Sequence, residues 1–262
     1  MPAFKLNDAE IAYIDRGNGP NLVLLHGFPL DNRVWNDAID FLENKFRVIA
    51  PDLRGFGRSV SNQTFSVESL ADDIHQLLAS IGALPCFLGG LSMGGYVALA
   101  FVKKYLSDLR GLALIDTKAA SDSPEAKQGR QQMIDLVRDA GSKAIADQMF
   151  PKMIALQSVN SVAAQKLRSI MDACPPLTIE HALAAMRDRA DYTALLPMLT
   201  IPILIVVGAE DAIASPDVAR AMHAAAPGSS VAVIPEAGHM APLENPRAFA
   251  DAMIAELITH RG

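Results

Sequence analysis

The chain has 262 residues, of which 50% are hydrophobic and 20% charged, and its formal net charge at pH 7 is −6 with neutral histidines. A chain of this length and composition can bury a large core without disulfides or metal ions, and it lacks the low hydrophobicity of disordered proteins. The acidic balance does not provide the basic surface that phosphate backbones require, so nucleic acid is not an expected partner.

The ends of the chain and its cysteines bear on the cellular compartment. The longest uninterrupted apolar run, residues 96–102, is too short to cross a bilayer. The first eight residues do not contain the apolar stretch of a signal peptide. Cys86 and Cys174 have neither metal-binding nor redox spacing, which is typical of a reducing compartment. These features predict a soluble cytoplasmic protein without a membrane partner.

In the first part of the chain, strand patterns alternate with helical patterns. Apolar residues recur at helical spacing over residues 67–81, and a second helix is expected over residues 94–105. Continuous apolar runs such as residues 22–26 are typical of strands buried on both faces of a parallel sheet. The strands expected here cover residues 4–6, 11–14, 22–26, 46–50, 86–89 and 109–115.

The pattern changes between residues 119 and 198, where helical stretches punctuated by prolines follow one another without a convincing strand. The alternation then resumes with strands over residues 203–208 and 231–234 and helices after Pro216 and from Pro246. This order predicts an α/β fold with a mostly parallel eight-stranded sheet covered by helices on both faces. Residues 1–118 and 199–262 would form one core, and residues 119–198 an inserted helical cap.

The segment Gly90-Leu91-Ser92-Met93-Gly94 lies between an expected strand and an expected helix. It contains Gly-x-Ser-x-Gly, the nucleophile elbow, in which the chain turns sharply and side chains at the two glycine positions would collide with their neighbours. The helix N-terminus also places N–H groups and positive dipole beside the serine. We therefore expect Ser92 to be a nucleophile, although a glycine-rich turn without chemistry is the alternative.

A serine hydroxyl needs a base to remove its proton, and histidine is the usual one. His239 follows the last expected strand, lies in a loop and comes after the serine in the chain, so we expect it to be the base. His26 precedes a glycine loop and fits a structural role better. The remaining histidines lie in expected helices or in the helical insertion: His75, His181, His223 and His260.

A carboxylate must hold the base in the correct tautomer and stabilise its charged form. Asp211 directly follows the expected strand 203–208, and the order Ser92, Asp211, His239 is that of the α/β hydrolases. Glu210 is adjacent but should point elsewhere. Asp116, at the end of an earlier strand, could also reach the histidine. We favour Asp211 and leave Asp116 as the alternative.

Acyl transfer also requires two hydrogen-bond donors where negative charge develops on the substrate oxygen. One expected donor is the backbone N–H of Met93, directly after the serine. The other is the backbone N–H of Phe28, in the loop His26-Gly27-Phe28-Pro29 that follows a strand. Taken alone, this loop would be interpreted as a simple turn.

Taken together, these motifs resemble the α/β-hydrolase superfamily, and most closely its small bacterial carboxylesterases and enol-lactone hydrolases. The resemblance implies a cap that covers the nucleophile and shapes the substrate pocket, and an architectural role for the loop 52–59. A serine nucleophile does not fit the dehalogenase branch, and Met93 stands where many perhydrolases carry threonine. The segments that carry the resemblance are residues 26–29, 52–59, 90–94, 208–211 and 238–239.

The expected function is a serine hydrolase that cleaves carboxylic esters of small to medium acyl chains through an acyl-enzyme. An enol-lactone or C–C bond hydrolase, a perhydrolase and a non-catalytic ligand receptor are the alternatives. We expect Leu30, Trp35 and Met240 to line the substrate pocket beside Phe28 and Met93. The sequence has no His-Glu-x-x-His and no complete Gly-x-Gly-x-x-Gly, so we expect neither a metal nor a cofactor. The expected partner is a small-molecule ester or lactone, and the oligomeric state stays open.

Overall fold

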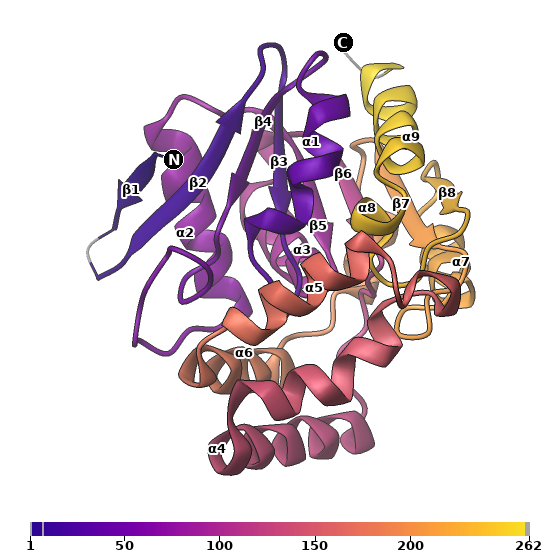
Figure 1. The fold of residues 1–262 in the computed structure, drawn as a ribbon. Coiled ribbons are helices and arrows are strands. Elements are labelled where there is room, and N and C mark those ends of the chain that lie inside the picture. Colours follow the sequence, from indigo (N-terminus) through magenta and orange to yellow (C-terminus); the bar gives the residue numbers. More distant parts are fainter. Residues whose placement is uncertain (1, 7, 260–262) are drawn as a thin grey trace.

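The computed structural model describes residues 2–6 and 8–259. Eight strands form one sheet in the order β1-β2-β4-β3-β5-β6-β7-β8 (Figure 1). β2 runs antiparallel to both of its neighbours, and the other paired strands are parallel. The strands are β1 Ala3–Lys5, β2 Glu10–Arg16, β3 Asn21–Leu25, β4 Arg47–Pro51, β5 Cys86–Leu91, β6 Leu109–Ile115, β7 Ile203–Gly208 and β8 Ser230–Ile234.

Helices cover the sheet on both faces, because successive strand residues point to opposite sides. In β3, Val23 and Leu25 join the core formed with α2 (Val67–Ser80), α3 (Met93–Tyr105) and α7 (Pro216–Ala225). Leu22 and Leu24 join the other core, which is formed with α1 (Asn36–Leu42) and α9 (Pro246–Thr259). The central strands are therefore buried on both sides, as their continuous apolar runs predict.

The helical segment, which we define as residues 119–198, lies between β6 and β7 in the chain. It contains α4 (Pro124–Met153), α5 (Val162–Ala173) and α6 (Pro176–Asp188), which Figure 1 shows grouped at one end of the sheet. Pro124 and Pro176 are the first residues of their helices, where the missing N–H costs nothing. Gly141 interrupts α4 with a φ of 76° and a ψ of −175°, so α4 is two helices joined by a kink.

Polar contacts tie the helical segment to the sheet core. The Thr178 hydroxyl donates to the Gly55 carbonyl at 2.8 Å, and the Lys166 ammonium lies 2.5 Å from the Asp37 carboxylate. Arg189 is buried, and its guanidinium lies 3.0 Å from Asp122 and 4.0 Å from the centre of the Tyr96 ring. Because Arg189 and Tyr96 are both buried, this contact fixes the end of α6 against α3.

The eight strands predicted from the sequence are confirmed in number and order. The structure adds α1, which the sequence analysis did not predict, between β3 and β4. Its apolar residues Ala38, Ile39 and Leu42 have helical spacing, but the helix has only seven residues, so the period repeats too few times to stand out. Within the described residues, no helix is both long and apolar enough to cross a membrane.

Candidate functional site

Ser92 sits at the turn between β5 and α3 in a backbone conformation that non-glycine residues rarely adopt. Its φ is 52° and its ψ is −112°. The Ser92 N–H donates to the Ile115 carbonyl at 2.9 Å, and the Thr117 hydroxyl donates to the Ser92 carbonyl at 2.7 Å. These two bonds to β6 and the residues after it hold the turn, so the side chain projects from the helix N-terminus.

The glycines on either side of Ser92 are required by close backbone contacts. A Cβ atom at Gly90 would lie 2.3 Å from the Gly94 carbonyl oxygen, and one at Gly94 would lie 2.3 Å from the Leu25 carbonyl oxygen. Real Cβ atoms do not approach other atoms this closely, so neither position accepts a side chain. The predicted reason for the Gly-x-Ser-x-Gly pattern therefore agrees with the structure.

The side chains of Ser92, His239 and Asp211 form a continuous hydrogen-bonded chain. His239 Nε2 lies 2.9 Å from Ser92 Oγ, and His239 Nδ1 lies 2.8 Å from Asp211 Oδ2. Asp211 follows β7 and His239 follows β8, so the ends of two parallel strands bring them together. A charged Asp211 favours the tautomer with hydrogen on Nδ1, which leaves Nε2 free to accept the serine proton.

Asp211 is buried but well supplied with donors. Its Oδ1 accepts hydrogen bonds from the N–H groups of Ile213 at 2.7 Å and Ala214 at 3.0 Å. Burial alone would raise its pKa, but the electrostatic interaction and hydrogen bond with His239, together with these two N–H groups, lower it. Asp211 is therefore the ionised carboxylate that the histidine requires.

The two alternative acids occupy other positions. Glu210 is exposed and accepts a hydrogen bond from Gln157 at 2.5 Å, so its side chain points away, as the sequence analysis expected. Asp116 is buried with a φ of 45°, and its Oδ1 accepts the Gly208 N–H at 2.7 Å. Burial and the neighbouring charge of Asp211 raise the pKa of Asp116 well above its usual range.

The loop that carries Phe28 lies directly against the serine. A Cβ atom at Gly27 would lie 3.1 Å from Ser92 Cβ. Within the described part of the chain, neither the Phe28 N–H nor the Met93 N–H has a hydrogen-bond acceptor, and both residues are buried. Two free N–H groups thus lie on segments that adjoin the serine.

His26 has the structural role that the sequence analysis favoured. It is fully buried, its Nε2 accepts the Leu53 N–H at 2.9 Å, and its Nδ1 donates to the Gly27 carbonyl at 2.8 Å. Burial lowers its pKa, so the ring is neutral. His26 therefore joins the loop after β3 to the loop after β4.

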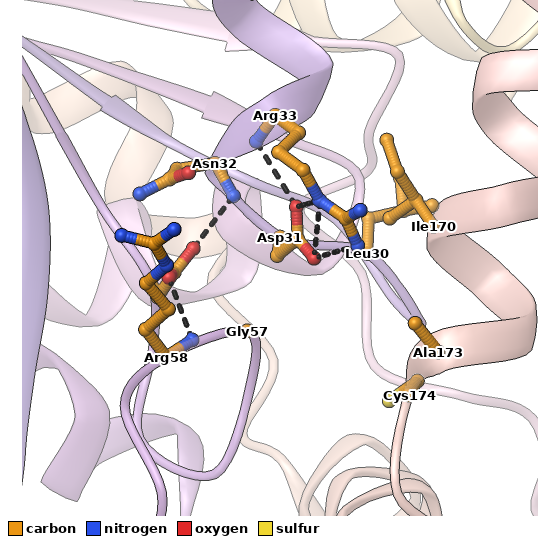
Figure 2. Close-up of a pocket in the computed structure, with 10 residues that line it drawn as sticks. Leu30, Asp31, Asn32, Arg33, Gly57, Arg58, Ile170, Ala173 and Cys174 are labelled. Atoms are coloured by element: carbon orange, nitrogen blue, oxygen red, sulfur yellow. Dashed lines mark hydrogen bonds and ion pairs between the residues drawn. The ribbon is translucent and has the colours of Figure 1, made fainter.

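The predicted pocket residues are distributed between a cavity and the core. Leu30 lines a cavity of about 230 Å³ between the loop after β3, the Arg58 loop and the C-terminal end of α5 (Figure 2). Trp35 is fully buried and packs against Phe249 of α9, with ring centres 5.9 Å apart. Met240 is also fully buried. A pocket role for these three residues stays a prediction.

Two further histidines of the described residues contact other partners. His75 stacks on Tyr105 with ring centres 3.8 Å apart and contacts Asp108, and His181 packs edge-on against Phe65. His260 lies outside the described residues. Within residues 2–6 and 8–259, no group of three or more histidine, cysteine or acidic side chains could hold a metal ion.

Glu244 is a site residue that the sequence analysis missed. It ends the short helix α8 (Ala241–Glu244) and is partly buried. Its carboxylate accepts hydrogen bonds from the N–H groups of Gly238 at 2.8 Å, Met240 at 3.3 Å and Ala155 at 2.8 Å. The signal was a glutamate in the first turn of a helix, a place from which it can reach back to free N–H groups. Glu244 thereby joins the His239 loop to the helical segment.

Known proteins of similar sequence identify the family of this chain. Residues 22–252 match the alpha/beta hydrolase family. The chain belongs to this family. Among curated members, it is 28% identical to a pimeloyl-[acyl-carrier protein] methyl ester esterase of Neisseria meningitidis, over 87% of this chain and 89% of that protein. The enzyme of the same name from Vibrio atlanticus is 30% identical, over 93% of this chain and 95% of that protein.

Solved structures also resemble this chain. A thermophilic esterase from Thermogutta terrifontis, solved with malate bound, is 41% identical with a TM-score of 0.93, over 97% of this chain and 95% of that one. The enol-lactonase from Burkholderia xenovorans is 24% identical with a TM-score of 0.89, over 98% of this chain and all of that one. At that identity, the second match shows the shared α/β-hydrolase fold alone.

Proposed function

We propose that this α/β hydrolase is a serine esterase that uses Ser92 as nucleophile, His239 as base and Asp211 as the supporting acid. The protein is an ester-cleaving hydrolase. The observation that carries the proposal is the hydrogen-bonded chain from Asp211 Oδ2 through His239 to Ser92 Oγ. The esterase activity named for its relatives in Neisseria, Vibrio and Thermogutta supports the same reaction.

The reaction follows from the geometry. His239 Nε2 takes the proton of Ser92 Oγ while this oxygen attacks the carbonyl carbon of the ester. The negative charge on the carbonyl oxygen is stabilised by the free N–H groups of Phe28 and Met93. The imidazolium, held by Asp211, then gives its proton to the departing alcohol. Water releases the acid from the acyl-enzyme by the same steps, and Ser92 recovers its proton.

The helical segment would form a cap over this site, and two contacts support this role. It follows β6, whose last residue Ile115 holds the Ser92 backbone, and it contacts the His239 loop through Glu244. We assign the substrate pocket to the space between this segment and Ser92, and the substrate class to esters of small to medium acyl chains. A panel of linear esters and lactones would separate this assignment from a lactonase.

The decisive experiment compares Ser92→Ala with Ser107→Ala, a matched change at an exposed serine outside the site. With a short-chain nitrophenyl ester, we expect Ser92→Ala to lose at least about 10³-fold in kcat/KM. Ser107→Ala should keep the wild-type rate. A fluorophosphonate should label Ser92 in the wild type, as read by peptide mass. Equal rates for Ser92→Ala and the wild type would refute the serine mechanism.

A further inference from the structure

Asp116 is a buried carboxyl group that the proposed reaction does not use. It is 1% exposed, and its left-handed backbone, with a φ of 45°, turns the chain directly after β6. Its N–H donates to the Val206 carbonyl at 2.8 Å, and its Oδ1 accepts the Gly208 N–H at 2.7 Å. Its Oδ2 is fully buried and receives no hydrogen bond from a side-chain N–H or hydroxyl group of the described residues. A buried carboxyl oxygen without a donor is costly when it is charged.

The position of Asp116 links it to both loops of the site. Gly208, which it binds, begins the turn that ends at Asp211, since the Asp211 N–H donates to the Gly208 carbonyl at 3.2 Å. The Asp116 carboxyl interacts with the Asp211 carboxyl and also faces the backbone of Ala241, two residues after His239. The titratable groups on this side are therefore Asp211 from the loop after β7 and, beyond it, His239 from the loop after β8.

Two adjacent buried carboxyl groups cannot both carry a negative charge at low cost, so one of them keeps its proton. The donors decide which one. Asp211 receives three hydrogen bonds, from His239, Ile213 and Ala214. Asp116 receives one strong bond, on Oδ1. The negative charge therefore resides on Asp211. The carboxyl hydrogen of Asp116 belongs on Oδ2, the oxygen that Gly208 does not bind, and the Asp211 carboxylate is its acceptor.

We propose that Asp116 is protonated in the folded protein and donates its carboxyl hydrogen to Asp211, so that it positions the carboxylate that holds His239. This inference rests on the proposed function for its effect on rate, but its protonation state can be measured without any substrate. Asp116 touches neither the serine nor the substrate, so it is a positioning residue.

The first test compares activity in three variants. Asp116→Ala removes the donor and leaves Asp211 with one partner fewer, and we expect a loss of about tenfold or more in kcat with little change in KM. Asp116→Asn should recover most of that loss, because its amide keeps an acceptor for Gly208 and offers an N–H to Asp211. Asp139→Asn makes the same chemical change at an exposed position and should match the wild type. Equal losses in the Ala and Asn variants would overturn the proposal.

The second test reads protonation from stability. A carboxyl whose pKa is raised by folding stabilises the folded state fully below its unfolded pKa, near 4, and loses that contribution as pH rises toward its folded pKa. Asparagine does not titrate. We therefore expect the urea midpoint of Asp116→Asn to rise relative to that of the wild type as pH increases from about 4 to about 8. Asp139→Asn should show no such trend.

The two outcomes separate the inference from the proposed function. A difference between Asp116→Asn and the wild type that stays constant with pH would mean that Asp116 is ionised, and would refute the inference even if Ser92 is the nucleophile. Conversely, if Ser92→Ala kept the wild-type rate, the proposed serine mechanism would fail, but the pH trend in the stability of Asp116→Asn would still be expected. An infrared difference spectrum between the wild type and Asp116→Asn at neutral pH should also contain the carbonyl band of a protonated carboxylic acid.

Discussion

The sheet core and the helical segment differ in the space around their glycines. In the core, a Cβ atom at Gly90, Gly94 or Gly208 would lie between 1.9 and 2.3 Å from a backbone oxygen. In the helical segment, Gly129 and Gly141 have nothing within 4 Å of that position. Gly82 and Gly228, in turns of the core, also have nothing within 4 Å. Close backbone approach is therefore found in the loops that build the site, and neither glycine of the helical segment shows it.

The close approaches in the core lie where the site is built. The nearest atom to a Cβ at Gly208 would be the Gly238 carbonyl oxygen, at 1.9 Å. Gly208 begins the turn to Asp211, and Gly238 precedes His239. Backbone contact between these two loops thus sets the distance between the acid and the base. The geometry of the proposed acid and base is thus set within the core, and we propose that substrate choice depends on the helical segment.

The largest expected effect tests the acid that the core supplies. Asp211→Asn keeps the shape of the side chain but can hold His239 in the wrong tautomer, and we expect kcat to fall about 10⁴-fold. Glu210→Gln is the matched control, because Glu210 is adjacent in sequence but points to Gln157 of the helical segment, and it should stay near the wild-type rate. Steady-state kinetics on a nitrophenyl ester measure both. Full activity in Asp211→Asn would exclude it as the acid.

The glycine comparison itself predicts opposite effects on stability. Gly90→Ala forces a methyl group onto the Gly94 carbonyl, and we expect a loss of about 3 kcal/mol or more in the free energy of unfolding. Gly129→Ala, inside α4 with open space around it, should gain about 0.5–1 kcal/mol because alanine favours helix. Urea unfolding measures both variants. Similar effects at the two sites would contradict the contrast between the regions.

The smallest expected effect is a difference in how often each region opens locally and exposes its buried cysteine to solvent. Cys86 lies in β5 within the sheet, and Cys174 follows α5 in the helical segment, and both are buried. Burial raises the pKa of Cys86 to about 12 and also raises that of Cys174, so both thiols are protonated and slow to react near pH 8. We expect Cys174 to react first with a disulfide reagent, because the helical segment can open without breaking the sheet.

Single-cysteine variants make this measurement unambiguous. Cys86→Ser leaves Cys174 to report on the helical segment, and Cys174→Ser leaves Cys86 to report on the core. When the cysteine reacts, the disulfide reagent releases a coloured thiol. The rate of this release from the folded protein, followed by absorbance, reports how readily each region opens. Faster reaction at Cys86 would show that the sheet opens before the helical segment, the reverse of the expected order.

The same contrast explains what the sequence could predict. The strands and Ser92 follow from local patterns, namely continuous apolar runs and a glycine pair around a serine. The contact between His239 and Asp211 followed from chain order and from the rule that parallel strands end at one edge. Asp116 was kept as an alternative acid that could reach the histidine, but its carboxyl group accepts the Gly208 N–H instead. Its buried surroundings, with few donors, depend on segments that are far apart in the chain. Short-range patterns do not contain that information.

Two other features escaped the sequence for related reasons. The helix α1 is too short for its apolar spacing to repeat. Glu244 binds N–H groups of Gly238 and Ala155, which are 6 and 89 residues away in the chain. A contact between residues 89 positions apart does not produce a periodic pattern in the sequence. The predicted pocket residues Trp35 and Met240 are apolar and fully buried. Apolar character in the sequence does not separate a cavity wall from a packed core, so their pocket role stays a prediction.

The carboxylate of Glu244 has a consequence for how this enzyme can change. One side chain holds the backbone before His239 and the backbone at Ala155, so the base and the insertion share an anchor. A substitution near residues 154–155 can then shift the imidazole without touching any substrate. In a mutational library, such positions should alter turnover for every ester alike, whereas substitutions elsewhere in the insertion should reorder the preference among esters.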